Sequence, residues 1–392
     1  MEIPLAERVN KVKPSPTLAV SAKAAQMKAE GRNVVSLSAG EPDFDTPEHI
    51  KKAAVKAIED GFTKYTAVDG IAELKQAIVD KFRRDNHLDY KLKQILVSVG
   101  GKQSCYNLCQ AYLNEGDEVI IPAPYWVSYP DMALLAGGVP VVVHATAEQG
   151  YKMSPEQLSK AITPKTRLMF LNSPSNPSGV AYTKDELKAL GEVLKQHSQI
   201  LIASDDMYEH ILWSKTFVNI VNACPELYER TVILNGVSKA YSMTGWRIGY
   251  AAGPSEVINA MKTIQSQSTS NPCSIAQKAA VAALNGGLET VEKMVKEFKK
   301  RHDYVADRLS EIQGLDVIPA DGTFYIFPNI QAIIERKGME NDVEFSAQLL
   351  NEQGLALVPG SAFGNEGCIR LSFATDMDSL IDALDRLYIF CN

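Results

Sequence analysis

TVILNGVSKAYSMTGWRIGYAAG, residues 231–253, has the pattern of two strands that flank a polar loop. The flanks TVILNGV and GWRIGYAAG are short apolar runs bounded by glycine, which is typical of buried strands. Lys239 lies between them, and Arg247 is the only other charged residue of the segment. Burying an ammonium group without a partner costs several kcal/mol, so a lysine in such surroundings calls for a functional explanation.

Runs of the same kind recur along the chain, and helical patterns lie between several of them. Ser154 with Gln157, and Thr183 with Glu186, form capping boxes that mark two helix starts. Strands that alternate with helices predict an α/β fold with a mostly parallel sheet covered on both faces. Counted together, seven runs predict a seven-stranded type of sheet: 95–100, 118–124, 139–145, 167–173, 199–206, 231–236 and 247–253.

The chain has 392 residues, which exceeds the usual size of a single core and predicts two domains. After residue 285 the pattern changes to one long amphipathic helix, 289–312, followed by the strand-like pieces TFYIF, LALVP and IRLSFA. We expect a large ligand-binding domain at 48–285 and a smaller α+β domain at 286–392. Residues 1–47 are expected to form an N-terminal arm and part of the smaller domain.

Composition excludes several classes of protein. The formal net charge of -7 argues against a binder of nucleic acid or acidic membranes. No apolar run approaches the roughly 18 residues that a membrane span needs, and the start MEIPLAERVNKVKPSP lacks the apolar region of a secretory signal. We therefore expect a cytoplasmic protein. The six cysteines and six histidines are scattered, so neither a metal site nor a disulfide framework is expected.

Polar or glycine-rich residues follow the predicted strands. The carboxyl ends of parallel strands meet at one edge of a sheet, where ligands bind. Gly100-Gly101 before a helix suits a phosphate group. The patterns GxGxxG and GxxxxGK[ST] are absent, so this phosphate belongs to neither NAD nor ATP, and an NAD-dependent dehydrogenase is disfavoured. The residues at these ends are 100–102, 124–126, 172–176, 205–206 and 238–239.

Asp205, Lys239 and Arg247 suggest a function only when they are considered together. Considered singly, Asp205 could be a helix cap or turn former, Lys239 a solvated lysine and Arg247 an ion-pair partner. Together they suggest an aldehyde cofactor with a phosphate tail and a basic ring nitrogen. The lysine would form an imine, the arginine would hold the phosphate, and the carboxylate would keep the ring nitrogen protonated.

The segment SKAYSMTGWRIGY resembles the lysine signature of the class I aminotransferases, which are pyridoxal-phosphate enzymes of fold type I. The resemblance spans nearly the whole chain in consistent order, and it is strongest to the bacterial aspartate subgroup, some members of which also act on prephenate. Further similar motifs are AGEPDFDTPEH (39–49), TKYTAVDGIAELKQAI (63–78), VGGKQSCYNL (99–108), PYWVSYPDM (124–132), NSPSNPSG (172–179), SDDMYEH (204–210), VPGSAFG (358–364) and IRLSFAT (369–375).

The resemblance implies pyridoxal 5'-phosphate as cofactor and assigns its contacts. Lys239 would be the Schiff-base lysine and the base that moves a proton between substrate and cofactor. Asp205 would pair with the ring nitrogen. The other implied cofactor residues are Tyr208 and Asn176 at the ring oxygen, Trp126 stacked on the ring, and Gly101, Lys102 (through its backbone), Ser238 and Arg247 at the phosphate. Tyr65 would reach the phosphate of a neighbouring subunit, which implies a homodimer with shared active sites.

The resemblance also implies substrate contacts. Arg370 would grip the α-carboxylate, since the planar fork of arginine fits a carboxylate bidentately. Trp126, Gly40 and Asn176 would complete that pocket. A second carboxylate would be held by Lys102 and Thr17, and Lys13 matches a position linked to prephenate use. Lys102 can also be read as a helix-start lysine, in which case the enzyme prefers another amino acid.

The resemblance therefore implies a ping-pong aminotransferase of amino-acid biosynthesis, with aspartate and 2-oxoglutarate as the leading pair. The alternatives are a prephenate, aromatic or alanine aminotransferase, and a β-lyase on the same fold. A ligand-sensing regulator is disfavoured because it would need a separate DNA-binding domain. The family often has Asp-Glu where this chain has Asp205-Asp206. Asp205 keeps the spacing to Tyr208, which leaves Asp206 without a role.

Overall fold

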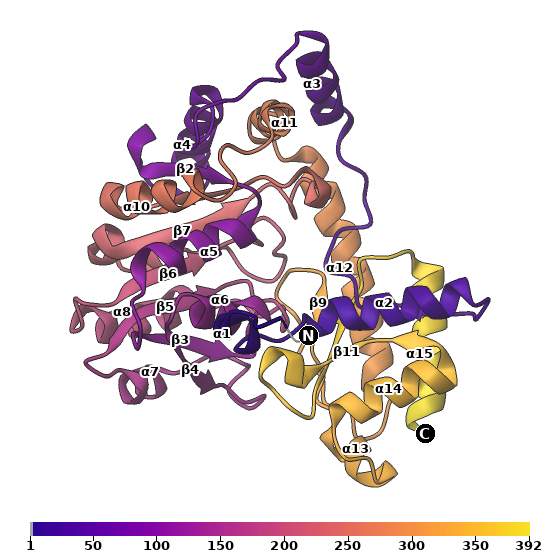
Figure 1. Ribbon diagram of the computed structural model, residues 1–392. Helices are drawn as coiled ribbons and strands as arrows, with labels where there is room; N and C mark the ends of the chain where they lie inside the picture. The colour runs from indigo at the N-terminus through magenta and orange to yellow at the C-terminus, as the bar shows by residue number, and fades with distance from the viewer. Residues whose placement is uncertain (1–2) are drawn as a thin grey trace.

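The computed structural model describes residues 3–392, and its centre is a seven-stranded sheet (Figure 1). All neighbouring strands are parallel except for one, which is antiparallel to both of its neighbours. The mostly parallel seven-stranded sheet predicted from the sequence is confirmed. In spatial order the strands are β2 (Ile95–Ser98), the antiparallel β8 (Gly249–Ala252), β7 (Thr231–Gly236), β6 (Leu201–Asp205), β5 (Thr166–Asn172), β3 (Glu118–Ala123) and β4 (Val139–His144).

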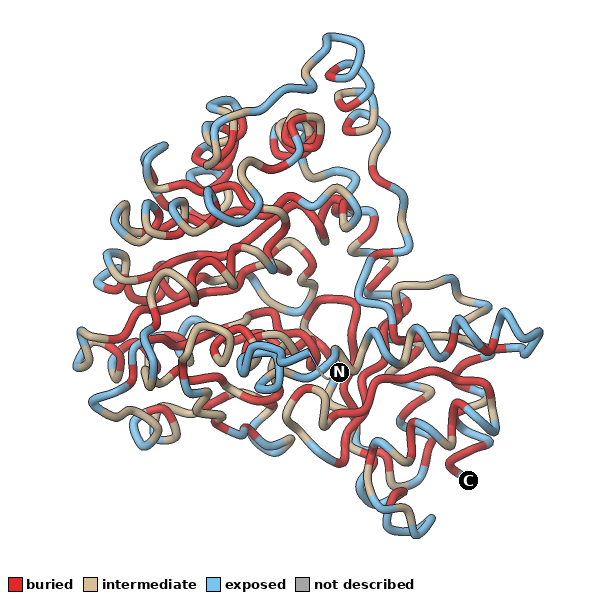
Figure 2. Tube along the Cα trace, viewed as in Figure 1, coloured by how far each residue is buried: buried red, intermediate tan, exposed pale blue. Residues whose placement is uncertain are grey.

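Helices cover both faces of this sheet. Alternate residues of one strand enter different apolar layers: Ile95 and Val97 lie in one layer and Leu96 in the other. Because both faces are covered, the central strands are buried along their length, as Figure 2 shows. One face packs against α5 (Gly101–Tyr112), α6 (Ser128–Leu135) and α10 (Ser255–Ser266). The other packs against α4 (Ala72–Asn86), α7 (Pro155–Ala161), α8 (Lys184–Lys195) and α11 (Ser274–Asn285), and α3 (Glu48–Glu59) packs on α11.

Two helix starts follow the capping boxes expected from the sequence. Ser154 accepts a hydrogen bond from the backbone of Gln157 at the start of α7, and Thr183 does the same for Glu186 at the start of α8. Each glutamine or glutamate side chain in turn accepts from the backbone of the cap residue. Both helices therefore begin where these side chains satisfy backbone N–H groups that lack helical partners.

A second, smaller α+β assembly lies beside the large sheet (Figure 1). The N-terminal strand β1 (Val35–Ser36) pairs in parallel with β10 (Leu355–Ala356), so residues from both ends of the chain pack together. The boundaries at 47/48 and 285/286 stay a prediction. The other elements of this part are α2 (Pro16–Ala29), α12 (Glu289–Ser310), α13 (Gln331–Lys337), α14 (Asp342–Gln353), α15 (Met377–Cys391) and the antiparallel strands β11 (Val358–Pro359), β12 (Ile369–Ser372) and β9 (Tyr325–Ile326).

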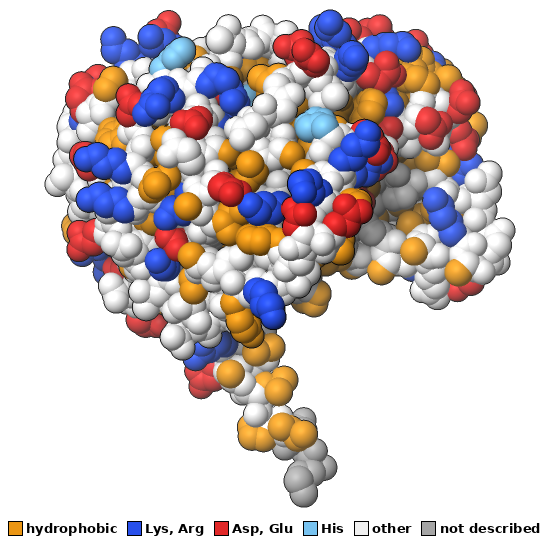
Figure 3. Space-filling model, turned by 90° about the horizontal axis from the view of Figure 1, so that it is seen from above, with side chains coloured by type: hydrophobic (Ala, Val, Ile, Leu, Met, Phe, Trp, Pro, Cys, Tyr) orange, Lys and Arg blue, Asp and Glu red, His pale blue; other side chains and the backbone are white. Residues whose placement is uncertain are grey.

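The N-terminal segment projects from the body of the molecule (Figure 3). It exposes the apolar side chains of Ile3, Leu5 and Val9. Within residues 3–392, no helix is both long enough and apolar enough to cross a membrane. The short helical pieces are α1 (Glu7–Asn10), α9 (Ile220–Ala223), η1 (Leu92–Gln94), η2 (Pro225–Arg230), η3 (Thr244–Trp246) and η4 (Gly360–Phe363).

Candidate active site

A cavity of about 650 Å³ lies at the carboxyl ends of β5, β6 and β7, and the smaller assembly, including its helix α2, contributes to its walls. This is the edge of the sheet at which the sequence places its polar residues. Twelve residues expected to bind cofactor or substrate line the cavity: Thr17, Gly40, Gly101, Lys102, Trp126, Asn176, Asp205, Tyr208, Ser238, Lys239, Arg247 and Arg370. The fold thus brings together side chains that are up to 353 positions apart in the chain (370 − 17).

Lys239 lies in the loop after β7, and its Nζ donates a hydrogen bond to the carbonyl oxygen of Gly40. Burial lowers the pKa of Lys239 to about 8, and the charges of Arg370 and Arg247 act in the same direction. Glu41 and Asp205 oppose this shift. A substantial fraction of this amine is therefore neutral near pH 8, and only a neutral amine can attack an aldehyde or accept a proton.

Asp205 ends β6 and is buried at the floor of the cavity. Its carboxylate accepts hydrogen bonds from the hydroxyl of Tyr129 and from the backbone N–H of Met207, the latter at 3.2 Å. Burial raises the pKa of Asp205, while these two hydrogen bonds and the charge of Lys239 lower it. A buried carboxylate with donors already in place is suited to bind a cationic N–H group that enters the cavity.

Tyr129 is a site residue that the sequence did not reveal. It lies on α6, is buried, and stacks on Phe170 with 4.4 Å between ring centroids. Its hydroxyl donates to Oδ2 of Asp205. It lies three positions after Trp126, within the motif PYWVSYPDM, but nothing in that motif indicates its contact with Asp205.

Replacing Tyr129 by phenylalanine is expected to move the acid limb of the pH profile of kcat/KM to higher pH. The lost hydrogen bond lowers the pKa of Asp205, so its removal raises that pKa, and a higher pH is then needed to ionise the carboxyl. The measurement is kcat/KM against pH for the two proteins. An acid limb that stays in place, or moves to lower pH, would show that Tyr129 does not tune Asp205.

The start of α5 and Arg247 form an anion-binding end of the cavity. The backbone N–H groups of the first helical residues, Gly101 and Lys102, lack intrahelical partners. Gly100 has φ 83°, and a Cβ there would collide with the guanidinium of Arg247. Arg247 donates to the carbonyl of Thr244 at 2.9 Å, and within residues 3–392 it has no carboxylate partner. A helix N-terminus beside an unpaired guanidinium fits a phosphate group.

Arg370, on β12, is a buried cation that uses two of its five N–H donors within residues 3–392. It donates to Oδ1 of Asn176 at 3.0 Å and to the carbonyl oxygen of Ser38 at 2.8 Å. Its guanidinium lies 4.5 Å from the ring centroid of Tyr325 and 4.9 Å from that of Phe363. In the described part of the chain, its Nε has no hydrogen-bond partner and no carboxylate pairs with it.

A buried arginine without an anionic partner is costly, and a carboxylate that enters the cavity would satisfy it.

Tyr208 lies nearby, and its hydroxyl is 3.2 Å from that of Tyr325. Burial raises the pKa of Tyr208 well above its ordinary value, so its hydroxyl is protonated and can donate. Lys102 Nζ lies 5.1 Å from the ring centroid of Trp126 at another wall. Tyr325 and Ser38 line the site without having been predicted.

Three residues noted in the sequence lie elsewhere. Lys13 does not line the cavity; it is exposed, and its backbone N–H and charge act on Asp131 of α6. Tyr65 also lies outside the cavity of its own chain, with 93% of its surface exposed. Asp206 points away from the cavity and binds the side chains of Ser204 and Asn219.

The donor set fits an aldehyde cofactor that carries a phosphate and a basic ring nitrogen. Lys239 supplies an amine with a lowered pKa. Arg247 and the start of α5 supply the phosphate end, and Asp205 supplies a buried carboxylate for the ring nitrogen. The guanidinium of Arg370, which lines the cavity and has no carboxylate partner in the described part of the chain, adds a place for a carboxylate substrate.

The chain is similar to known proteins over nearly its full length. The sequence model of the family described as aminotransferase class I and II matches residues 32–387. The chain is 57% identical over 390 residues to the aspartate/prephenate aminotransferase of Nitrosomonas europaea, with 98% of each chain covered. It is 51% identical over 387 residues to the aspartate aminotransferase of Geobacillus stearothermophilus, again with 98% of each covered.

Solved structures of aspartate aminotransferases are also similar to this chain over nearly its full length. The aspartate aminotransferase of Rhizobium meliloti superimposes with a TM-score of 0.96 at 47% identity, and 100% of this chain and 99% of that one are covered. The aspartate aminotransferase of Thermus thermophilus with maleate gives a TM-score of 0.94 at 43% identity, with coverage of 99% and 100%.

Proposed function

Because the chain belongs to the class I and II aminotransferases, and is therefore a pyridoxal-phosphate-dependent enzyme, we propose that it transfers the amino group of L-aspartate to 2-oxoglutarate. The products are oxaloacetate and L-glutamate, formed in two half-reactions at one site. The buried guanidinium of Arg370, unpaired at Nε and facing the cavity that holds Lys239, carries this proposal. It supplies a fixed anchor for the α-carboxylate that amino acids and 2-oxo acids share.

Pyridoxal phosphate, when bound, supplies an electron sink for the negative charge that develops on the substrate α-carbon. Lys239 would hold the cofactor covalently through its amine when no substrate is bound. The same amine, with a pKa lowered to about 8, is suited to take up the proton of the substrate α-carbon and to release it later.

The other residues bind and orient. Asp205 would pair with the ring nitrogen and hold its proton, and Tyr208 would donate to the ring oxygen. Arg247 and the first N–H groups of α5 would bind the phosphate and so keep the cofactor in place while Lys239 is not bound to it. Arg370 fixes the α-carboxylate, which orients the α-hydrogen toward Lys239.

Lys102 and Thr17 are the proposed contacts of the second carboxylate, and both line the cavity. Replacing Lys102 by alanine is expected to lower kcat/KM for aspartate about tenfold or more, since a hydrogen bond between charged groups contributes about 1.5–3 kcal/mol. The backbone N–H of residue 102 remains, so binding of the phosphate is kept. Steady-state kinetics with aspartate, alanine and phenylalanine measure the effect, and the two monocarboxylates serve as controls.

Equal losses for all three amino acids would contradict the role of Lys102 in holding a second carboxylate. A wild-type enzyme that prefers alanine or phenylalanine to aspartate would contradict the proposed donor. Either outcome is compatible with amino transfer at Lys239, because that reaction needs only the amino group and the α-carboxylate of the substrate and not a second carboxylate.

Prephenate is the second candidate acceptor. Two relatives, from Nitrosomonas europaea and Cereibacter sphaeroides, carry the name aspartate/prephenate aminotransferase at 57% and 54% identity. Lys13, expected to contribute to this use, lies outside the cavity of this chain. Assay of prephenate as amino acceptor with glutamate as donor tests the activity, and a Lys13→Ala variant tests the residue.

The proposed assembly is a homodimer with shared active sites. Tyr65 is expected to bind the cofactor phosphate of the neighbouring copy, and its exposure and its absence from the lining of its own cavity support this. The exposed apolar residues of the N-terminal segment suit a contact with a second copy. The cytoplasmic location expected from the sequence stays a prediction.

A further inference from the structure

The turn that follows β6 sends its side chains in two directions. Asp205 and Tyr208 line the cavity. Asp206 and Glu209, one position after each, are 3% and 6% exposed and lie outside the cavity lining. The proposed reaction uses the first two residues and gives the other two no task, although burying a carboxyl group is costly.

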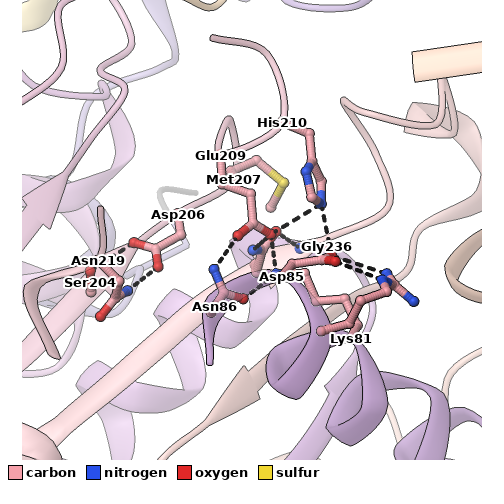
Figure 4. Close-up of polar contacts among 12 residues, drawn as sticks. Lys81, Asp85, Asn86, Ser204, Asp206, Met207, Glu209, His210, Asn219 and Gly236 are labelled. Atoms are coloured by element: carbon pink, nitrogen blue, oxygen red, sulfur yellow. Dashed lines mark hydrogen bonds and ion pairs between the residues drawn. The ribbon is translucent and has the colours of Figure 1, made fainter. Parts of the chain in front are cut away.

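Glu209 is at the centre of a buried polar cluster behind this turn (Figure 4). It forms an ion pair with Lys81 of α4, which is only 1% exposed. Asn86, at the end of α4, accepts from Lys81 Nζ at 2.7 Å and donates to Glu209 Oε2 at 2.8 Å. Helix α4 thus holds the turn through two side chains that act on one carboxylate.

The same carboxylate reaches the strand that leads to Lys239. Asn235, the penultimate residue of β7, donates to Glu209 Oε1 at 2.7 Å. The side-chain oxygen of Asn235 also accepts from the backbone N–H of Gly236 at 2.7 Å. Lys239 follows three residues later, so Glu209 connects the two segments between which the proposed cofactor lies.

Neighbouring charges shift the pKa values of the two buried carboxyl groups, Glu209 and Asp206, in opposite directions. Burial raises the pKa of Glu209, but the charge of Lys81, the charge of His210 and the hydrogen bond from Asn86 outweigh burial and lower it. Asp206, at the other side of the cluster in Figure 4, has a pKa raised well above its ordinary value by burial and by the charge of Glu209. The charge of Lys81 therefore favours the ionised form of Glu209, and the charge of Glu209 opposes ionisation of Asp206.

Stability alone does not explain such an arrangement. A buried ion pair can often be replaced by apolar residues of similar volume with no loss of stability, or with a gain. What an apolar pair cannot supply is a set of directed hydrogen bonds that fixes two loops relative to each other.

We propose that Lys81 and Glu209 are positioning residues for the cofactor-binding loops. Glu209 fixes its own turn, which carries Asp205 and Tyr208, and through Asn235 it fixes the loop that follows β7. Lys81 holds Glu209 in its ionised form and in one orientation. The inference rests on the proposed function in that these loops are taken to bind pyridoxal phosphate.

Two double variants separate the hydrogen bonds from the charges. Lys81→Met with Glu209→Gln is neutral and keeps an acceptor for Asn235. Lys81→Met with Glu209→Leu is also neutral but removes every side-chain hydrogen bond of position 209. The control is Lys75→Met, on the same helix, whose lysine pairs at 2.6 Å with Asp69, away from the cavity lining.

The readouts are the visible circular dichroism of bound pyridoxal phosphate, its dissociation constant, kcat with aspartate, and thermal unfolding of the cofactor-free protein. For the leucine variant we expect an altered dichroism band, and about a 10- to 100-fold loss in both affinity and kcat, because small displacements of binding groups have effects of that size. The glutamine variant and the Lys75→Met control are expected to keep the wild-type band and affinity.

A leucine variant with the wild-type band, affinity and kcat would overturn the proposal, since the loops would then be held without Glu209. Equal losses in the glutamine and leucine variants would also overturn it. If the leucine variant does not fold, Asn235→Ala is tested by the same dichroism band and affinity, because it keeps the ion pair while it removes the hydrogen bond to Glu209 and the one from Gly236 N–H. Failure of the proposed function would appear separately, as a wild-type protein that binds pyridoxal phosphate but does not react with aspartate.

Discussion

Replacement of Lys239 by alanine is expected to lower kcat by about 10⁴-fold or more, because the covalent anchor of the cofactor and the base for the α-proton are lost together. The fold is expected to stay intact, since Lys239 is half-buried and its side-chain hydrogen bond, to the carbonyl oxygen of Gly40, lies at the cavity. Steady-state kinetics with aspartate and 2-oxoglutarate, together with thermal unfolding, measure both effects.

The matched control is Lys56→Ala, since Lys56 forms an exposed ion pair with Asp60 on α3. This variant is expected to keep the wild-type kcat, because an exposed pair contributes only about 0–1 kcal/mol to stability. A Lys239→Ala protein that turns over at the wild-type rate would contradict the assignment of the cofactor lysine.

Replacement of Arg370 by glutamine is expected to have the second largest effect, on kcat/KM for every amino acid and oxo acid. Removing one member of a buried charge pair costs about 2–5 kcal/mol, which corresponds to a loss of about 30-fold to several thousand-fold in kcat/KM. The loss should fall on all substrates alike, because each carries the α-carboxylate. Steady-state kinetics with aspartate, glutamate and alanine measure it.

A second readout separates binding from folding. A non-reactive dicarboxylate is expected to raise the unfolding temperature of the wild-type protein and to lose this effect in Arg370→Gln, because only a ligand bound by the folded state stabilises it. The control is Arg230→Gln, since Arg230 donates to carbonyl oxygens of Leu194, His197 and Ile200 away from the cavity. The KM of the Arg230→Gln variant should stay at the wild-type value. An unchanged KM in the Arg370→Gln variant would contradict the role of Arg370 in binding the α-carboxylate.

Much of the fold could be predicted because the central strands are buried on both faces. Strands such as β6 and β7 are then continuous apolar runs that end at polar residues, which makes both their extent and their carboxyl ends visible in the sequence. The direction of β8 was not predicted. It follows β7 after a connection without a crossover helix, which gives an antiparallel neighbour.

The site could be predicted where a residue lies at a strand end or in a family motif. Tyr129, Tyr325 and Ser38 could not, because their partners come from distant segments of the chain. Nothing in the sequence around Tyr129 indicates that the rotation of α6 aims its hydroxyl at Asp205. Such pairings depend on how helices pack on the sheet, which periodicity alone does not determine.

Asp206, left without a role by the sequence, has a structural one. It accepts from Ser204 and Asn219, and Asn219 also caps α9. Its neighbour Asp205 faces the cavity because successive side chains of an extended segment point to opposite sides. Asp205 therefore belongs to the cavity, while Asp206 stabilises the structure behind it.

The visible absorbance of the purified protein, recorded before and after addition of a single amino acid without any oxo acid, tests the central claim most directly. The account predicts that aspartate and glutamate each convert the band of the bound cofactor to that of its amine form, since one half-reaction proceeds alone in a ping-pong enzyme. Absence of a cofactor band even after addition of pyridoxal phosphate, or a band that no amino acid changes, would contradict it.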